Sequence, residues 1–204
     1  MKKDLVTVIK SINYGEADKI LTVFSKYNGK MVLMAKGLRK INSKNRGNMQ
    51  TLSTSEITYY EGRGMPILIE SKLILSPNID SKISTQNLSR LLFLLNKVLM
   101  EGDKNEILFD SLQSVLKADM SLEKVNKFRI KMLQESGFLK DFKTCERCKS
   151  NSGVKYFDVN IFGGLCESCY SKGFKGVKLG KEIYTDLKFS ESLDRYIKKV
   201  IEEI

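Results

Sequence analysis

The stretch KILTVFSKYNGKMVLMA, residues 19–35, predicts a β-hairpin. In its first half two sets of mostly apolar side chains alternate, as they do along a strand whose side chains point to opposite faces. The dipeptide Asn28-Gly29 favours the positive φ angles of a tight two-residue turn. The chain then returns from Lys30 to Ala35 and places Met31, Leu33 and Ala35 on one face.

Three segments around this hairpin also have the composition of strands. They are Leu5–Ile9, Glu56–Tyr60 and Ile67–Leu75, and Gly62-Arg63-Gly64 separates the last two. Five short strands without a long helical run predict a small closed barrel or a sandwich.

Beyond Pro77 the apolar period changes to that of helices, because proline and the residue before it resist helix. Amphipathic helices are expected over residues 85–101 and 106–117, and a third from Ser121 to a stop at Gly137. Residues 180–204 predict one or two more, with Ser190 as a cap. We therefore expect an α+β protein with a first domain over residues 1–78 and a helical domain over residues 79–204, which includes a cysteine-bearing segment at 144–170.

The positive charge of the chain is concentrated near its N-terminus. The net charge is +11, and residues 1–78 hold 13 Lys and Arg against 6 Asp and Glu. Eight basic residues and no acidic residue lie between Lys19 and Ser55. Such a field attracts polyanions, although a lysine-rich solubility bias explains it about as well. The candidate phosphate contacts are Lys26, Lys30, Lys36, Arg39, Lys40, Lys44, Arg46 and Arg63.

Four tyrosines in the same region are candidate platforms for stacking with bases. They are Tyr14, Tyr27, Tyr59 and Tyr60. One of the adjacent pair Tyr59 and Tyr60 should face the core and the other solvent, because neighbouring side chains of a strand alternate. For any one of them, a place in the barrel core is the favoured interpretation.

The four cysteines have the spacing C-x2-C-x17-C-x2-C. They are Cys145, Cys148, Cys166 and Cys169. Two such loops complete the tetrahedral four-sulfur shell that zinc prefers, and four protein ligands leave no position open for substrate. We therefore expect one structural Zn²⁺, with an iron–sulfur cluster or redox-active thiols as alternatives.

Several classes of enzyme are excluded by what the sequence lacks. It has no histidine, so a histidine triad and imidazole acid–base chemistry are ruled out. It also lacks a phosphate-binding G-x-x-x-x-G-K-[ST] loop. A nuclease with a metal held by Glu16, Asp18 and Glu56 stays open as an alternative to a protein without catalysis. With no apolar stretch long enough for a bilayer and no signal-peptide core, the expected location is the cytoplasm.

The order of these features resembles that of the bacterial RecO family of recombination mediators. The resemblance rests on YGEADKIL at 14–21, KGLRK at 36–40 with Arg46-Gly47, YEGRG at 60–64, residues 128–148, and GGLC at 163–166. It covers nearly the whole chain, although members of that family usually continue with further helix beyond the position of Ile204. It implies an oligonucleotide-binding (OB) barrel of five strands, followed by a helical domain with an inserted zinc-binding segment.

The resemblance also implies a function. Members of the family bind single- and double-stranded DNA, anneal complementary strands, and help to load RecA together with RecR. They contact single-stranded-DNA-binding protein and have no catalytic residues. From the residues alone, a zinc-ribbon module that binds RNA, or an adaptor that binds only protein, remains the alternative, because barrels of this kind accept either nucleic acid.

Overall fold

The computed structural model describes residues 1–77, 82–118, 120–158 and 160–202, with the side chains of residues 82–84 and 181 left aside. Within it the chain forms two compact units, residues 1–120 and residues 121–204. The expected domain boundary between residues 78 and 79 lies outside the described residues. Two helices beyond that boundary belong to the same compact unit as the strands before it.

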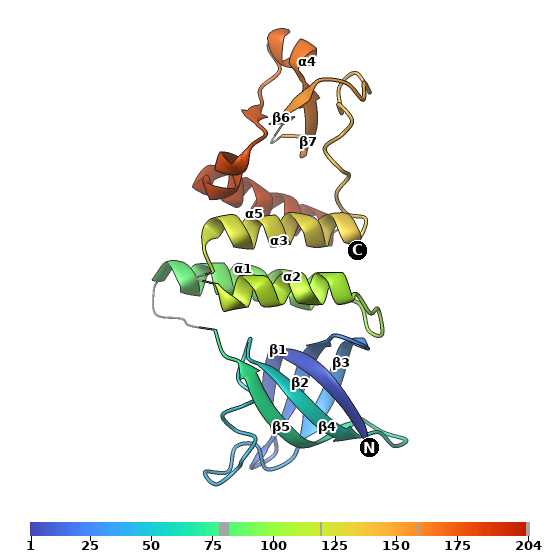
Figure 1. The fold of residues 1–204 in the computed structure, drawn as a ribbon, viewed down its shortest axis with the longest axis vertical. Helices are drawn as coiled ribbons and strands as arrows, with labels where there is room; N and C mark the ends of the chain where they lie inside the picture. The colour runs from blue at the N-terminus through green and yellow to red at the C-terminus, as the bar shows by residue number, and fades with distance from the viewer. Residues whose placement is uncertain (78–81, 119, 159, 203–204) are drawn as a thin grey trace. The chain divides into compact units, whose positions relative to one another are not determined.

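The first unit contains the closed five-stranded barrel that the sequence predicts (Figure 1). Its strands are β1 (Lys2–Tyr14), β2 (Asp18–Ser25), β3 (Gly29–Ala35), β4 (Thr54–Tyr60) and β5 (Ile67–Leu75), in the spatial order β1-β2-β3-β5-β4. The long β1 pairs with both β2 and β4, and an irregularity between Val8 and Lys10 bends it between them. The barrel closes where β3 meets β5 through the single parallel pair Met34 and Ile67.

The side chains of β2 and β3 alternate between two faces as the sequence predicts, and one of these faces lines the core of the barrel. Leu21, Val23 and Leu33 are fully buried inside it. Phe24 points away from this core and is nevertheless buried, because its ring packs edge-on against that of Phe109 at 5.4 Å. The barrel core consists of Val6, Val8, Leu21, Val23, Leu33, Ala35, Leu38, Met49, Ile57, Tyr59 and Leu68.

The turn of the central hairpin is one residue longer than the two-residue turn that we expected. Ser25 pairs with Gly29, so three residues connect the strands. The Ser25 hydroxyl accepts hydrogen bonds from the backbone N–H groups of Tyr27 and Asn28, at 3.1 and 2.8 Å. Among residues 25–29 of this turn, only Gly29 takes a positive φ, 67°. The serine side chain therefore stabilises a longer turn than the Asn-Gly pair predicts.

The connection from β3 to β4, residues 36–53, is an exposed basic loop that is anchored at both ends. Leu38 and Met49 insert into the barrel core. Asn45 and Asn48 bind the main chain of β5: the Asn45 amide oxygen accepts from Ser71 N at 2.9 Å, and the Asn48 amide donates to Ser71 O at 2.7 Å. The loop thus satisfies main-chain groups of β5 near the point where β3 and β5 barely pair.

Two helices of the first unit pack against one end of the barrel (Figure 1). They are α1 (Lys82–Val98) and α2 (Glu106–Lys117), and α2 has the predicted bounds. The Asn96 side chain donates to Ile9 O at 2.8 Å, and Gln113 donates to the Thr7 hydroxyl at 2.9 Å. Helix α1 ends three residues before the predicted Glu101, because the chain there turns to bridge with Gly29 at the start of β3.

The second unit combines helices with a small sheet. It contains α3 (Leu122–Glu135), β6 (Val154–Asp158), β7 (Gly163–Cys166), α4 (Glu167–Ser171), β8 (Val177–Lys178), the 3-10 helix η1 (Lys181–Thr185) and α5 (Leu187–Glu202). The strands form a sheet in the order β7-β6-β8, so the cysteine-bearing region is more regular than we expected.

Helix α5 begins earlier than the predicted cap at Ser190. Asp186 is the residue that caps it, since its carboxylate accepts from Phe189 N at 3.0 Å. Ser190 is instead fully buried within the helix and donates to the Asn126 amide oxygen of α3. The buried Arg129 of α3 completes this contact through an ion pair with Asp194 of α5. A polar network therefore joins α3 to α5 where an exposed cap was expected.

Candidate nucleic-acid interface and metal centre

The predicted basic residues lie at two ends of the β2–β3 hairpin. Lys26 and Lys30 flank its turn, whereas Lys36 follows β3 at the other end. Lys36 lies six positions after Lys30, a distance of about 20 Å along an extended strand. The sequence places all of these cations in one acid-free stretch, but the structure does not bring them together.

The two lysines near the turn bind groups of the packed helices. Lys26 forms an ion pair with Asp110 of α2 at 2.9 Å, and this hydrogen bond raises the pKa of the Lys26 ammonium. Lys30 donates to the carbonyls of Asn96 and Leu99 at the end of α1, at 2.8 and 3.1 Å. Burial lowers the pKa of the Lys30 ammonium. In this structure both ammonium groups serve to seat helices on the barrel.

At the opposite rim of the barrel lies a basic pocket of about 440 Å³, here called the rim pocket. Three of its six side chains are cationic, and none is acidic. The Arg39 guanidinium donates to Gly15 O at 3.2 Å, and Arg39 N donates to Ala17 O at 2.9 Å, so the β1–β2 turn positions this residue. The rim pocket is lined by Asn13, Lys19, Leu38, Arg39, Arg46 and Gln50.

Lys19 is a member of the rim pocket that the sequence did not identify as a candidate. It begins the acid-free stretch and has the same strand parity as the buried Leu21 and Val23. That parity is the signal by which it could have been found, because an inward position at the end of the barrel where a strand begins faces the rim. The candidates Lys36, Lys40 and Lys44 are exposed on the same loop outside the lining, and Arg63 is exposed in the β4–β5 turn.

The tyrosines divide as predicted. Tyr59 is 2% exposed and belongs to the barrel core, whereas its neighbour Tyr60 is 52% exposed. Tyr14 and Tyr27 are similarly exposed, at 53% and 52%. Three of the four rings can therefore reach a base, and Tyr59 cannot.

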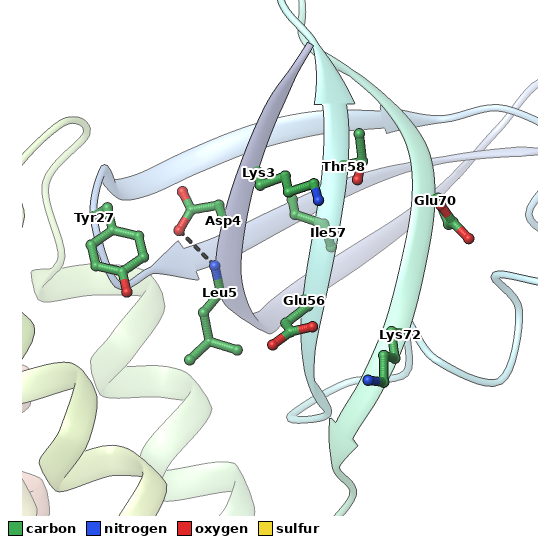
Figure 2. Close-up of a pocket in the computed structure, with 9 residues that line it drawn as sticks. All are labelled: Lys3, Asp4, Leu5, Tyr27, Glu56, Ile57, Thr58, Glu70 and Lys72. Carbon is green, nitrogen blue, oxygen red and sulfur yellow. Dashed lines mark hydrogen bonds between the residues drawn. The ribbon is translucent and has the colours of Figure 1, made fainter.

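A second hollow of the barrel, of about 560 Å³, has mixed charge (Figure 2). Asp4, Glu56 and Glu70 line it together with Lys3 and Lys72. The Asp4 carboxylate is already bound by Leu5 N at 2.7 Å and by the Ser25 hydroxyl at 2.5 Å. Its three carboxylates make this hollow a poor site for phosphate.

The carboxylates considered for a nuclease do not form a metal site. Asp18 accepts a hydrogen bond from Gly37 N at 2.7 Å, and Glu56 lines the mixed-charge hollow. Within residues 1–77, 82–118, 120–158 and 160–202, the one group of three or more side chains that could hold a metal ion is the four cysteines.

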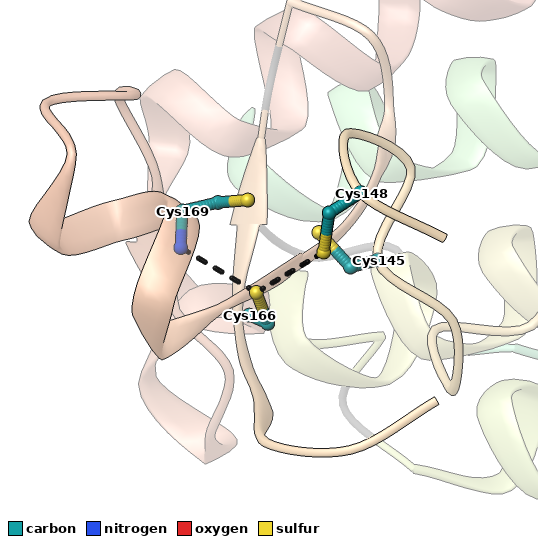
Figure 3. Close-up of side chains that lie close together, drawn as sticks. All are labelled: Cys145, Cys148, Cys166 and Cys169. Carbon is teal, nitrogen blue, oxygen red and sulfur yellow. Dashed lines mark hydrogen bonds between the residues drawn. The ribbon is translucent and has the colours of Figure 1, made fainter. Parts of the chain in front are cut away.

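The four cysteines converge on one point of the second unit (Figure 3). Cys145 and Cys148 come from a turn, Cys166 from the end of β7 and Cys169 from α4. All four sulfurs lie within 4.8 Å of one another, and those of Cys148 and Cys166 are 3.6 Å apart. A tetrahedral zinc ion with Zn–S bonds of about 2.3 Å separates its sulfurs by about 3.8 Å. The arrangement therefore has the size of a zinc site.

Backbone hydrogen bonds shape the two cysteine loops. Cys145 N donates to Ser150 O, and Glu146 N donates to Gly164 O of β7, both at 2.8 Å. Lys149 takes a φ of 61°, which turns the chain sharply after the first cysteine pair. A side chain at Gly164 would lie 2.8 Å from Thr144 O, so only glycine permits the two loops to approach this closely.

The thiols also respond to one another. Burial raises the pKa of Cys145, but the N–H groups of Cys148, Cys166 and Arg147 donate to its sulfur and bring the pKa down to about 6. Burial and the neighbouring thiols raise the pKa of Cys169 to about 12. The surroundings therefore shift the pKa values of these two thiols in opposite directions. Four thiolates at neutral pH need a cation among them, which the donor set fits.

The acidic residues around the cysteines are all paired. The buried Asp158 binds Arg147 at 3.0 Å, and Glu146 binds Lys149 at 2.7 Å. Glu167 binds Lys155, also at 2.7 Å. These cations are therefore neutralised by carboxylates and do not act chiefly on the sulfurs.

No helix among the described residues has the length and apolar character needed to cross a membrane.

Comparison with known proteins identifies the family of the chain. The family described as "Recombination protein O N terminal" matches residues 1–77, and "Recombination protein O C terminal" matches residues 88–195. A "DNA repair protein RecO" of Shouchella clausii is 30% identical over 84% of this chain and 70% of its own length. Those of Syntrophomonas wolfei and Clostridium perfringens are 29% and 27% identical, over 86% and 96% of this chain and 72% and 83% of their own lengths. With both family regions matched in order, the chain belongs to the RecO family of DNA repair and recombination proteins.

Proposed function

We propose that this protein is a DNA-binding recombination mediator without catalytic activity. In this proposal it binds single- and double-stranded DNA, anneals complementary strands, and acts with RecR to load RecA onto DNA covered by single-stranded-DNA-binding protein. These partners come from the family resemblance. Since the substrate would be chromosomal DNA, the proposed place of action is the bacterial cytoplasm, at the nucleoid.

The rim pocket is the observation that carries this proposal. Lys19, Arg39 and Arg46 gather there on a closed barrel, with no carboxylate in the lining. Guanidinium groups bind phosphate through paired hydrogen bonds, and the exposed loop adds Lys36, Lys40 and Lys44 nearby in sequence. Contacts to the backbone carry little sequence information, which suits a protein that acts wherever DNA is damaged.

Lys26 and Lys30 are not part of the interface that we propose. Their ammonium groups are engaged with Asp110 and with carbonyls of α1, so a contact with phosphate would first have to break these bonds. The proposed contacts are the rim pocket, the loop lysines and Arg63. Neutralising phosphates of two strands lowers their mutual repulsion, which favours annealing.

We propose that the cysteine cluster holds one structural zinc ion. The ligands would be Cys145, Cys148, Cys166 and Cys169, whose sulfurs are already within 4.8 Å of one another. A bound ion would cross-link the turn at 145–148 to β7 and α4. Four sulfur ligands leave no place for a reacting group, which supports a role in folding over one in catalysis.

A salt titration of DNA binding tests the proposal. Fluorescence anisotropy with labelled single-stranded DNA should give strong binding in dilute buffer that weakens steeply as salt is added. Charge reversal of Lys19, Arg39 and Arg46 to Glu should weaken binding and flatten the salt slope by about 2, since each lost single-strand phosphate contact removes about 0.7.

The matched control reverses three exposed lysines elsewhere in the same unit, Lys97, Lys104 and Lys117, and should change the slope little. If the wild-type protein ignored DNA in dilute buffer, the proposal would be wrong. A preference for RNA of equal length would favour the RNA-binding alternative, and cleavage of labelled DNA with Mg²⁺ would favour a nuclease.

A further inference from the structure

The segment that follows the last cysteine has unbalanced positive charge. From Ser168 to Lys181 the sequence has four lysines and no acidic residue. Upstream, the acidic Glu146, Asp158 and Glu167 each pair with another cation. No ion pair joins Lys172, Lys175 or Lys178 to a carboxylate of the described residues, and all three are exposed.

Aromatic rings are interleaved with these lysines. The ring of Tyr170 stacks on that of Tyr156, with centroids 3.9 Å apart and planes 7° from parallel. Tyr170 is nevertheless 41% exposed, so the stack supports one face of its ring and leaves surface available. Phe174 is 40% exposed, and the Arg147 guanidinium lies over its ring at 4.6 Å. Rigid, half-exposed rings beside free cations are the features with which proteins hold single-stranded nucleic acid.

Backbone hydrogen bonds connect the start of this segment to the last cysteine. Lys172 N donates to Cys169 O at 3.1 Å, and Gly173 takes a φ of 93° to reverse the chain. Further on, Val177 and Lys178 form the edge strand β8 beside β6. The lysines and rings are thus presented by the chain that directly follows Cys169 and by the edge strand of the small sheet.

We propose that Tyr170, Lys172, Phe174, Lys175 and Lys178, here called the ribbon surface, bind a second single strand of nucleic acid. The lysines would contact phosphates, and the rings would stack on bases. The inference deepens the proposed function and rests on it, because annealing brings together two strands and the rim pocket accounts for one. The cysteine cluster then has a role beyond stability, since it holds the second strand-binding surface in shape.

The stoichiometry of binding tests this inference directly. A fluorescent 12-nucleotide oligothymidine, titrated at low salt, should bind at two molecules per wild-type chain. The variant Lys172→Glu, Lys175→Glu, Lys178→Glu should bind one, and the rim-pocket variant Lys19→Glu, Arg39→Glu, Arg46→Glu should also bind one. Both variants should anneal complementary strands at least tenfold more slowly. The Lys97, Lys104 and Lys117 control should bind two and anneal normally.

Two further measurements separate binding from folding. The ribbon variant should keep the zinc content of the wild type, because none of its changes touches a ligand. In the unmodified protein, an oligonucleotide carrying 4-thiothymidine should cross-link under ultraviolet light to the peptide that contains Tyr170 and Phe174. This readout needs no variant to fold.

The outcomes distinguish this inference from the proposed function. One oligonucleotide per wild-type chain, with no cross-link near Tyr170 and normal annealing by the ribbon variant, would overturn the inference and leave the rim pocket as the only strand site. The ribbon surface would then be free for an acidic protein partner. No binding to the wild-type chain at all would instead refute the proposed function.

Discussion

The barrel and the cysteine-bearing module at residues 144–178 are held together by different physical means. The barrel buries a continuous set of eleven side chains contributed by all five strands and the β3–β4 loop. The core around the cysteines consists of Cys145, Leu165, Cys166 and Cys169, with Val154 and Tyr156 partly buried against it. Three of these six side chains are cysteines. Apolar burial can stabilise the barrel by itself, whereas in our proposal the module needs an ion to cross-link its loops.

The two regions nevertheless share one electrostatic feature. Each carries an acid-free stretch in which cations occur together with exposed aromatic side chains, namely Tyr27 at residues 19–55, and Tyr170 and Phe174 at residues 168–181. In the barrel the strands position these groups, and in the module the cysteine cluster does. Removal of the metal ligands should therefore affect the module and spare the barrel, and truncation of an apolar core side chain in the barrel should do the reverse.

Removal of the metal ligands should have the largest effect. Replacing Cys145 and Cys148 with Ser should lower the zinc content from about one per chain to none, because two ligands cannot hold the ion in the presence of a chelator. Structural zinc provides about 10–16 kcal/mol in small peptides, so residues 144–178 should lose their order. Hydrogen exchange should show fast exchange across β7 and α4, with the protection of β2 and β3 unchanged.

The aromatic side chains of the second unit limit how far this loss spreads. Phe157 is fully buried and packs edge-on against Phe162 and Phe189, at 4.8 and 5.4 Å. These contacts tie β6 to α5 independently of the sulfurs. If the doubly substituted protein kept full protection in β7 and α4, the view that the ion folds this module would be wrong.

A truncation in the barrel core should have the reciprocal effect at a smaller size. Leu33 is fully buried in the barrel, and Leu33→Ala should cost about 2–5 kcal/mol of unfolding free energy, from lost burial and the cavity that remains. Urea denaturation followed by circular dichroism measures this loss. Zinc content should stay at about one per chain, and the exposed Ile12→Ala, in the same barrel, serves as the control with little change.

Sequence patterns determine the parts of this molecule that depend on period and spacing. The alternation of residues 19–35 separated the two faces of the hairpin strands, and the structure shows that the face with Leu21, Val23 and Leu33 lines the core. The cysteine spacing identified the four sulfurs that converge. Both signals are local, because a strand period and a C-x2-C loop each act within a few residues.

The features that the sequence did not reveal depend on tertiary contacts. The turn before Gly29 is longer than expected because the Ser25 hydroxyl binds two backbone N–H groups, and it also donates to Asp4 of β1. Lys19 belongs to the rim pocket because the loop at residues 36–53 folds back over the barrel. A run of basic residues shows how much charge is present, but only the fold shows which cations share a surface.

The smallest predicted effect concerns Lys30, the partly buried lysine beside the turn of the β2–β3 hairpin. Burial lowers its pKa; Glu101 opposes this shift, and Lys10 adds to it. Between that lowered value and its ordinary value of 10.5, the unfolded chain binds the proton more tightly than the folded protein. Wild-type stability should therefore rise with pH in this window relative to Lys30→Met, in which the group cannot titrate. Urea denaturation at a series of pH values measures the difference, and Lys97→Met, at an exposed position, should show none.

Because the Lys30 ammonium donates to carbonyls of α1, Lys30→Met should also leave the salt slope of DNA binding unchanged. A flattened slope in Lys30→Met would place this lysine on phosphate and extend the nucleic-acid interface to both ends of the hairpin.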